Sequence, residues 1–455
     1  MSSSAPETRP HLAPENPSRS AAFRGDIEGM RAVAVLLVVA FHAGLPIIRG
    51  GYVGVDVFFV LSGFLIPGLL VDELRRTGTL SFSGFYARRA RRLLPLAAVV
   101  LASTVAAAHL LVAPVDRSGV GRDVAAAALW VANWNFAGQS TQYMADVDKS
   151  PVLHFWSLSV EEQFYLLWPL LLLCLAGGTW IVRRSWTGAM RRVAIGLVAI
   201  GALSLVLSWR VTTTDASLAY FGLHTRAWEL ALGSGIALAR PLLPRLPRLM
   251  AVAGGWLGLA MVVGSSVVLD KDTPFPGTAA LLPVVGTGLL VATGVAAASS
   301  GPARLLDRSI PRFIGRISYA WYLWHWPCLV LANARWGVAP DTSTGEAATT
   351  PHAGAAVVLA AVAASFALAV VSHYLVEQPL RHARWFVISR RRSLQLGAVA
   401  VAACLASAWT LHASPAEDTV SRPSRHPTNH RQRRPRSTRP APRRPEARAH
   451  ARRFT

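Results

Sequence analysis

Long apolar runs separated by short polar loops dominate the chain. A helix needs about 17–25 mostly apolar residues to cross the hydrocarbon core of a bilayer, and eleven runs approach or reach that length. The runs lie at residues 27–45, 52–71, 93–113, 153–176, 194–211, 226–240, 249–269, 279–298, 313–336, 354–377 and 394–412. We therefore predict an all-α polytopic integral membrane protein with ten core transmembrane helices and an eleventh at the end.

Basic residues are unevenly distributed between these runs. Alternate loops hold six, four, three, four and five Lys or Arg, whereas the loops between them hold none to three. Because Lys and Arg concentrate in short cytoplasmic loops, the amino terminus is predicted to be cytoplasmic. The same alternation would put the tail after residue 412 outside, which the arginines of that tail oppose, so its side stays open.

Composition agrees with a membrane protein and divides the chain into four parts. Hydrophobic residues make up 52% of the chain and charged residues 15%, and the mean hydropathy is +0.37. Much of the net charge of +22 comes from twelve arginines between Arg422 and Arg453, so it does not indicate a nucleic-acid-binding domain. We expect a disordered cytoplasmic leader, a membrane domain, a linker with an added helix, and a disordered Arg/Pro-rich tail. Their predicted bounds are 1–22, 23–382, 383–412 and 413–455.

Arg31 and His42 are ionisable side chains inside the first apolar run, where such groups are costly unless they serve a purpose. Their spacing of eleven residues puts them within about 20° on one helix face and about 16 Å apart along it. This predicts a polar stripe from the membrane edge toward the interior. An imidazole can accept and return a proton near neutral pH, so His42 is a candidate catalytic residue.

Asp56 lies about five residues into the second run, within a glycine-rich block. A carboxylate at that depth should face a polar cavity or a partner. His42 is a plausible partner because only a short outer loop separates the two runs. An oriented carboxylate would raise the basicity of the imidazole, so we predict that Asp56 or Glu161 assists His42.

Four arginines directly precede the third run, at positions 88, 89, 91 and 92. Ordinary anchoring on the inner side of the membrane explains them as well as a binding role does. Arg89 and Arg92 are three residues apart, so they would share a helix face and could both bind phosphate groups. A nucleotide-bearing donor such as coenzyme A would offer such phosphates from the cytoplasm.

The fourth run begins with polar residues at helical spacing. His154, Ser157, Glu161 and Tyr165 would lie on one face and form a polar seam, in which His154 is a candidate substrate-binding residue. An aromatic belt at the membrane surface is the alternative interpretation. Adjacent glutamates point about 100° apart on a helix, so only one shares the seam, and Glu161 is favoured.

Three further residues could contact substrate or support the fold. Arg226 and Glu229, three residues apart, could neutralise each other as a structural pair or bind substrate. His325 lies among aromatic residues, where a packing role competes with substrate contact. The three cysteines have no metal or redox spacing, and we predict no metal site.

Together, five motifs of the chain resemble the acyltransferase-3 family of membrane O-acyltransferases, over roughly residues 23–382. They are Arg31-x10-His42, Gly-Gly-Tyr-Val-Gly-Val-Asp-Val-Phe-Phe-Val-Leu-Ser-Gly-Phe, Arg-Arg-x-x-Arg-x-x-Pro, Trp-Ser-Leu-Ser-Val-Glu-Glu-Gln-Phe-Tyr-Leu and Ile-Ser-Tyr-x-x-Tyr-Leu-Trp-His-Trp-Pro. The resemblance implies that His42 is the catalytic histidine paired with Arg31. It also implies that Arg89 and Arg92 bind acyl-CoA, and we predict that Arg31 belongs to the same donor-binding group. Glu161 falls on the acidic position of the fourth motif.

The resemblance further implies a function. The family moves acyl groups, commonly acetyl, from cytoplasmic acyl-CoA onto envelope glycans or exported small molecules, which suggests a multi-pass protein of a bacterial plasma membrane. Many relatives carry an additional extracytoplasmic esterase-like domain, for which the residues after 412 are too few. We therefore expect either a separate extracytoplasmic transferase or acylation by the membrane domain alone.

The alternative is a transporter of an anionic solute or glycan precursor, which would use the same buried charges as a binding site. The number of spans favours it, whereas the inner-face arginines and the lack of a visible repeat oppose it. The acyl chain length, the acceptor, the oligomeric state and the choice between direct transfer and an acyl-histidine stay open.

Overall fold

The computed structural model describes residues 24–140, 143, 150–178, 182, 184–298, 300–337 and 354–413, and no strand occurs among them. All of them belong to one compact unit, Met1–Pro415. The predicted leader lies outside the described residues, as does the predicted tail apart from residue 413.

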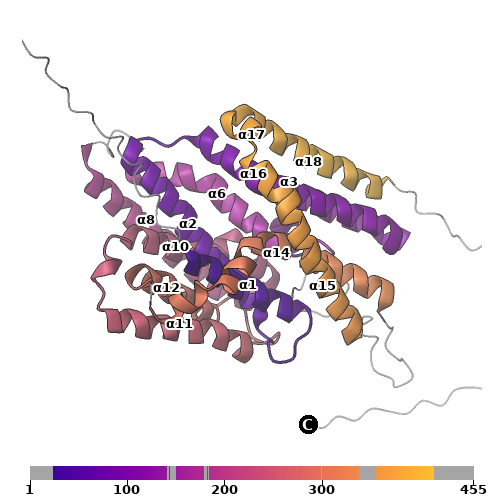
Figure 1. The fold of residues 1–455 in the computed structure, drawn as a ribbon, viewed down its shortest axis with the longest axis horizontal. Coiled ribbons are helices and arrows are strands. Elements are labelled where there is room, and N and C mark those ends of the chain that lie inside the picture. Colours follow the sequence, from indigo (N-terminus) through magenta and orange to yellow (C-terminus); the bar gives the residue numbers. More distant parts are fainter. Residues whose placement is uncertain are drawn as a thin grey trace, which may run out of the picture. The chain divides into compact units, whose positions relative to one another are not determined.

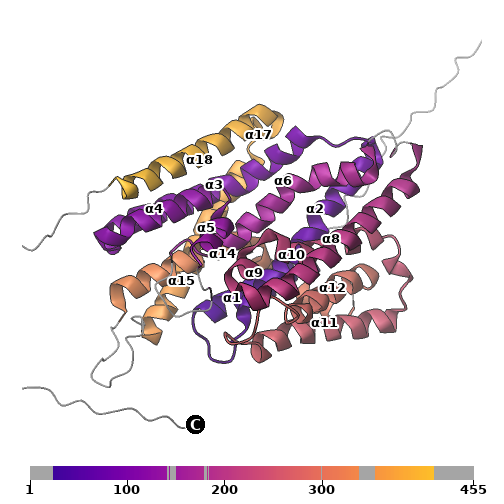
Figure 2. The same ribbon diagram turned by 180° about the vertical axis from the view of Figure 1, so that it is seen from behind.

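Helices of very different length follow one another along the chain (Figures 1 and 2). The amino-terminal half contains α1 (Gly25–His42), η1 (Gly51–Val53), α2 (Gly54–Thr77), α3 (Phe82–Leu111), α4 (Pro114–Ala128), α5 (Ala132–Gly138), α6 (Phe155–Ala176), α8 (Trp186–Thr214) and α9 (Ala216–Phe221). The remainder contains α10 (Leu223–Ala239), η2 (Leu243–Arg245), α11 (Arg248–Val268), α12 (Leu281–Ala296), α13 (Gly301–Leu306), α14 (Ser309–Trp336), α15 (Ala355–Ser372), the π-helical turn η4 (His373–Glu377), α16 (Gln378–His382), α17 (Arg384–Ile388) and α18 (Arg390–His412).

The structure confirms the all-α polytopic class. Each of the eleven predicted runs forms a helix, and seven helical segments of the described chain are long and apolar enough to cross a membrane. The other four runs, in α1, α10, α12 and α14, fall outside that set. Helices α10 and α12 are short, α1 carries three charged residues, and the middle of α14 is rich in aromatic residues and histidine.

Neighbouring helices pair closely in this unit. Helix α1 packs against α14, α2 against α10, α11 against α12, and α3 against α18, which runs alongside it in both views (Figures 1 and 2). A tight link joins α2 to α3: Gly78 ends α2 with a φ of 68°, and the Ser81 hydroxyl caps α3 by accepting a hydrogen bond from Gly84 N at 3.3 Å. This link brings the arginines of α3 next to α2.

Two glycines let α2 and α10 approach closely. A Cβ atom on Gly63 would lie 2.1 Å from the carbonyl oxygen of Leu230, and one on Gly233 would lie 2.1 Å from that of Val60. The Ser234 hydroxyl donates to the carbonyl of Gly63 at 3.2 Å across the same contact. Small residues at such a crossing permit backbone contact, which drives helix association in a membrane where no hydrophobic effect operates between helices.

A buried ion cluster joins the same two helices. Arg226 of α10 donates from Nη1 to Asp56 of α2 at 2.9 Å and to Glu229 at 2.7 Å, and all three side chains are fully buried. The second carboxylate oxygen of Asp56 has no hydrogen-bond partner. The predicted hydrogen bond between Asp56 and His42 is therefore not formed, because the nearby guanidinium is the stronger partner for a buried carboxylate.

Replacing Gly63 with Ala should destabilise the fold by about 1–3 kcal/mol, because the backbone of α10 cannot yield to the added methyl group. Thermal unfolding of the purified protein in detergent measures the effect. Gly68→Ala on the same helix is the matched control, since its Cβ would lie at an ordinary 3.6 Å from Ala237. Equal unfolding temperatures for both variants would contradict the proposed close contact.

Replacing Arg226 with Met should cost about 3–5 kcal/mol in unfolding free energy, because two buried carboxylates lose the cation that pairs with them. Adding Asp56→Asn and Glu229→Gln to that variant should recover part of the loss. Arg240→Ala is the control, since Arg240 pairs with Asp72 in a half-exposed ion pair that should contribute less than about 1 kcal/mol. No difference between the Arg226 and Arg240 variants would show that the cluster is not needed for stability.

Candidate active site

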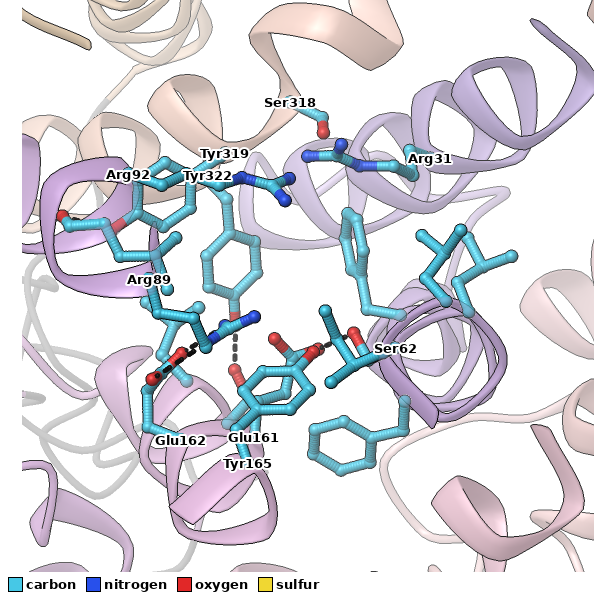
Figure 3. Close-up of a pocket in the computed structure, with 18 of the residues that line it drawn as sticks. Arg31, Ser62, Arg89, Arg92, Glu161, Glu162, Tyr165, Ser318, Tyr319 and Tyr322 are labelled. Carbon is cyan, nitrogen blue, oxygen red and sulfur yellow. Dashed lines mark hydrogen bonds and ion pairs between the residues drawn. The ribbon is translucent and has the colours of Figure 1, made fainter. Parts of the chain in front are cut away.

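A cavity of about 190 Å³ lies between α1, α2, α3, α6 and α14 (Figure 3). One wall is apolar and consists mainly of α2 side chains such as Phe58, Leu65 and Leu69. The polar side chains that line it are Arg31, Ser62, Arg89, Arg92, Ser157, Glu161, Glu162, Tyr165, Ser318, Tyr319 and Tyr322. The structure thus brings together five charged residues from three helices that are distant in sequence.

Arg31 and Arg92 point toward the same part of the cavity, near Ser318 (Figure 3). Their guanidinium groups are close enough for the two positive charges to repel each other. Neither of them forms an ion pair or a side-chain hydrogen bond with any described residue, which distinguishes them from the other arginines of this region. Two converging cations without a paired acid form a site suited to an anion.

Arg89 has a different environment. Its Nη2 atom donates to Glu162 Oε1 at 2.6 Å, and its guanidinium carbon lies 3.5 Å from the ring centroid of Tyr165. The side chain is therefore held against α6 by an ion pair and a cation–π contact. Arg89 and Arg92 line the same cavity, as predicted. The guanidinium that lies near that of Arg92, however, is the one of Arg31 and not that of Arg89.

Glu161 and its neighbour Glu162 both line the cavity. The hydroxyl of Ser62 on α2 donates to Glu161 Oε1 at 2.8 Å (Figure 3). The two adjacent glutamates thus have different partners, as their 100° separation on a helix predicts. Glu161 contributes a carboxylate to the cavity wall, and it makes no hydrogen bond to His42.

Tyr322 closes one side of the cavity. Its hydroxyl forms a 2.6 Å hydrogen bond with Ser157 and donates to the carbonyl of His154 at 3.2 Å. Its own carbonyl oxygen accepts a 2.6 Å hydrogen bond from His325 Nδ1, one helical turn later. One residue thus links the cavity to a group of histidines beyond it.

His42 ends α1 within that histidine group. Its Nδ1 atom lies 3.0 Å from His325 Nε2, and its Nε2 atom lies 2.7 Å from the hydroxyl of Tyr143. The indole of Trp326 covers the ring at a centroid distance of 4.4 Å. His42 is not among the residues that line the cavity, so His325, Tyr322 and Ser157 connect the two places.

The remaining predicted residues lie apart from the cavity. His154 is 1% exposed, and its Nε2 atom donates to the carbonyl of Leu323 at 3.1 Å. His325 is fully buried, and Arg226 and Glu229 belong to the ion cluster between α2 and α10. None of these four side chains lines the cavity, and each is packed against other described residues.

Three residues near the cavity and His42 were not predicted as site residues, and their signals in the sequence differ. Ser62 lies within the second motif, and Tyr322 is one helical turn before His325, so both could have been chosen by spacing. Tyr143 had no such signal, because it lies between two apolar runs and reaches His42 only through the fold. Among the described residues, no group of three or more His, Cys, Asp or Glu could hold a metal ion.

Comparison with known proteins shows which family the sequence belongs to. A family model described as an acyltransferase domain matches residues 24–374. The peptidoglycan O-acetyltransferase OatA of Listeria monocytogenes is 30% identical over 362 residues, which cover 78% of this chain and 55% of OatA. YrhL of Bacillus subtilis, provisionally named a peptidoglycan O-acetyltransferase, is 30% identical over 376 residues, or 80% of this chain and 56% of YrhL.

A Staphylococcus aureus protein provisionally named an O-acetyltransferase is 29% identical over 314 residues, or 68% of this chain and 51% of that protein. The chain thus spans about half the length of the curated relatives it matches. No solved structure matches it. With a family model that covers most of its described residues, this polytopic membrane protein belongs to the acyltransferase-3 family.

Proposed function

We propose that this protein transfers an acyl group, acetyl by its similarity to the relatives above, from acyl-CoA to a hydroxyl of an envelope glycan or an exported small molecule. The names of the relatives support acetyl as the group and a peptidoglycan-type glycan as the acceptor. The observation that carries the proposal is the pair of cavity arginines, Arg31 and Arg92, without an acidic partner among the described residues. Coenzyme A supplies the phosphates that such a pair would bind.

Donor binding would use the three cavity arginines unequally. Arg31 and Arg92 would contact the donor phosphates directly, because no ion pair has to break first. Arg89 would shape the wall through its ion pair with Glu162 and its contact with Tyr165. Since Arg31 lies two turns into α1, and the amino terminus is proposed to be cytoplasmic, the donor would enter from the cytoplasm.

Acyl transfer would take place toward His42, about 16 Å farther along α1 than Arg31. The acceptor hydroxyl would lose its proton to His42 as its oxygen forms a bond to the acyl carbon and the bond from that carbon to the CoA sulfur breaks. The proton would then neutralise the departing thiolate, so donor and acceptor exchange one acyl group for one proton. The same bonds would form and break overall if His42 carried the acyl group transiently between donor and acceptor.

The other predicted residues divide into two groups. Glu161 lines the cavity and remains a candidate for orienting the donor or the acyl group. Asp56, Arg226 and Glu229 would support the fold, because they form a closed ion cluster outside the cavity. This assignment replaces the catalytic role predicted for Asp56 and the substrate-binding role considered for the other two.

Inside-out vesicles containing the protein should transfer label from radioactive acetyl-CoA to a glycan or small-molecule fraction. His42→Ala should lower that rate about 100-fold or more, because proton transfer in the transition state is lost. Scintillation counting of the separated fractions measures the transfer. His109→Ala is a control, since His109 lies at the end of α3 and bonds Thr410 on α18.

Absence of label with acetyl-CoA and with longer acyl-CoA donors would overturn the proposed function and favour the transporter. Uptake of an anionic solute by the same vesicles would then be the next assay. Equal rates for the wild type and His42→Ala would retain the transferase but remove His42 from its mechanism.

Arg31→Ala and Arg92→Ala should each weaken acetyl-CoA binding about 10- to 100-fold, because each removes a charged hydrogen-bond donor from the cavity. Isothermal titration calorimetry in detergent measures the affinity. Arg88→Ala on the same helix as Arg92 should bind normally, since Arg88 is half-exposed and pairs with Glu73. Equal losses for Arg88 and Arg92 would indicate general charge attraction rather than a specific site.

A further inference from the structure

His325 is fully buried outside the cavity, and each of its ring nitrogens has a hydrogen-bond partner. Its Nδ1 atom lies 2.6 Å from the carbonyl oxygen of Tyr322, and its Nε2 atom lies 3.0 Å from His42 Nδ1. A carbonyl oxygen can only accept a hydrogen bond, so the proton of the neutral His325 ring must be on Nδ1. Its Nε2 atom therefore presents an electron pair to His42.

This arrangement determines the tautomer of His42. Because His325 Nε2 can only accept, the proton of the neutral His42 ring must be on Nδ1. The Nε2 atom of His42 then carries the electron pair and accepts the 2.7 Å hydrogen bond that the Tyr143 hydroxyl donates. The backbone carbonyl of Tyr322 thus determines the tautomer of His325, and His325 in turn determines the tautomer of His42.

The ring geometry supports a directed hydrogen bond between the two histidines. Their planes differ by 12° and their centroids are 5.2 Å apart. With the two nitrogens 3.0 Å apart, this separation puts both nitrogens between the ring centres, as a hydrogen bond in the plane of the rings requires. The Trp326 indole on one ring and Tyr322 beside the other hold this arrangement.

We infer that His325 is a positioning residue that keeps the proton of His42 on Nδ1. The Nε2 electron pair, which accepts from Tyr143 here, would then accept from the acceptor hydroxyl when that hydroxyl takes the place of Tyr143. His325 occupies the place that a carboxylate takes in Ser-His-Asp sites, where the third residue fixes the tautomer and orientation of the histidine. A neutral imidazole suits a buried membrane site, because a carboxylate there would need a cation of its own. The inference rests on the proposed function and replaces the substrate contact considered for His325.

A pair of conservative variants tests the hydrogen bond. In His325→Gln the side-chain amide reaches the position of the imidazole Nε2, so its oxygen can still accept from His42. In His325→Asn the amide reaches only the position of Nδ1, so His42 loses its acceptor. We expect the Gln variant to keep kcat within about tenfold of the wild type. The Asn variant should lose about 100-fold in kcat with KM for acetyl-CoA unchanged.

Two controls separate this role from packing. Cys328→Ala, three residues farther along α14, should leave kcat unchanged, and thermal unfolding of each variant reports its folding. Equal kcat values for the wild type and both variants would overturn the inference. Equal losses in Gln and Asn variants that fold and bind acetyl-CoA would also overturn it, since they would show that the ring is needed only for packing.

A measurement without turnover distinguishes this inference from the proposed function. Nitrogen NMR of ring-labelled histidine, with the His42 signals assigned by their absence from His42→Gln, reports the tautomer directly. The wild type should show the Nδ1–H form, and His325→Asn a mixture of both tautomers. A wild-type mixture would overturn the positioning role even if the protein transfers acetyl groups. A pure Nδ1–H form without any transfer would instead overturn the proposed function.

Discussion

The interior of a bilayer offers no water to bind polar groups, and the placement of the buried charged side chains depends on that constraint. Three groups of buried charged and titratable side chains bear on the site: the cavity arginines and glutamates, the histidines around His42, and the ion cluster of Arg226. Each group satisfies its members in a different way. The cluster pairs opposite charges, the histidines share hydrogen bonds, and the cavity keeps two cations available to a ligand.

This division explains why similar residue types have different roles in the same bundle. Arg226 is fully buried and bonded to two carboxylates, so it stabilises the contact of α2 with α10. Arg31 has no acidic partner within ion-pair distance among the described residues, so its charge is available to an anionic ligand. A cation that is neutralised within the protein supports the fold, whereas one that lacks a paired acid is a candidate for binding.

Helices α1 and α14 connect the binding and reaction ends of the proposed site. Helix α1 carries Arg31 in the cavity and His42 at its end, and α14 lies against it with Tyr322 at the cavity wall and His325 beside His42. The side chain of Tyr322 faces the cavity while its carbonyl holds His325. A shift of this one turn would therefore change both the cavity wall and the orientation of His42.

The sequence by itself determined the helical membrane class, the eleven apolar runs, the stripe from Arg31 to His42 and the cavity residues Arg89, Arg92 and Glu161. These follow from hydropathy and from the periodicity of a single helix, which act over short stretches of chain. Only the tertiary structure decided the partners: Asp56 bonds Arg226 instead of His42, Arg31 joins Arg92, and His325 bonds His42. Such contacts join helices up to 283 residues apart in sequence, and helical periodicity fixes the face of each residue but not which helix covers it.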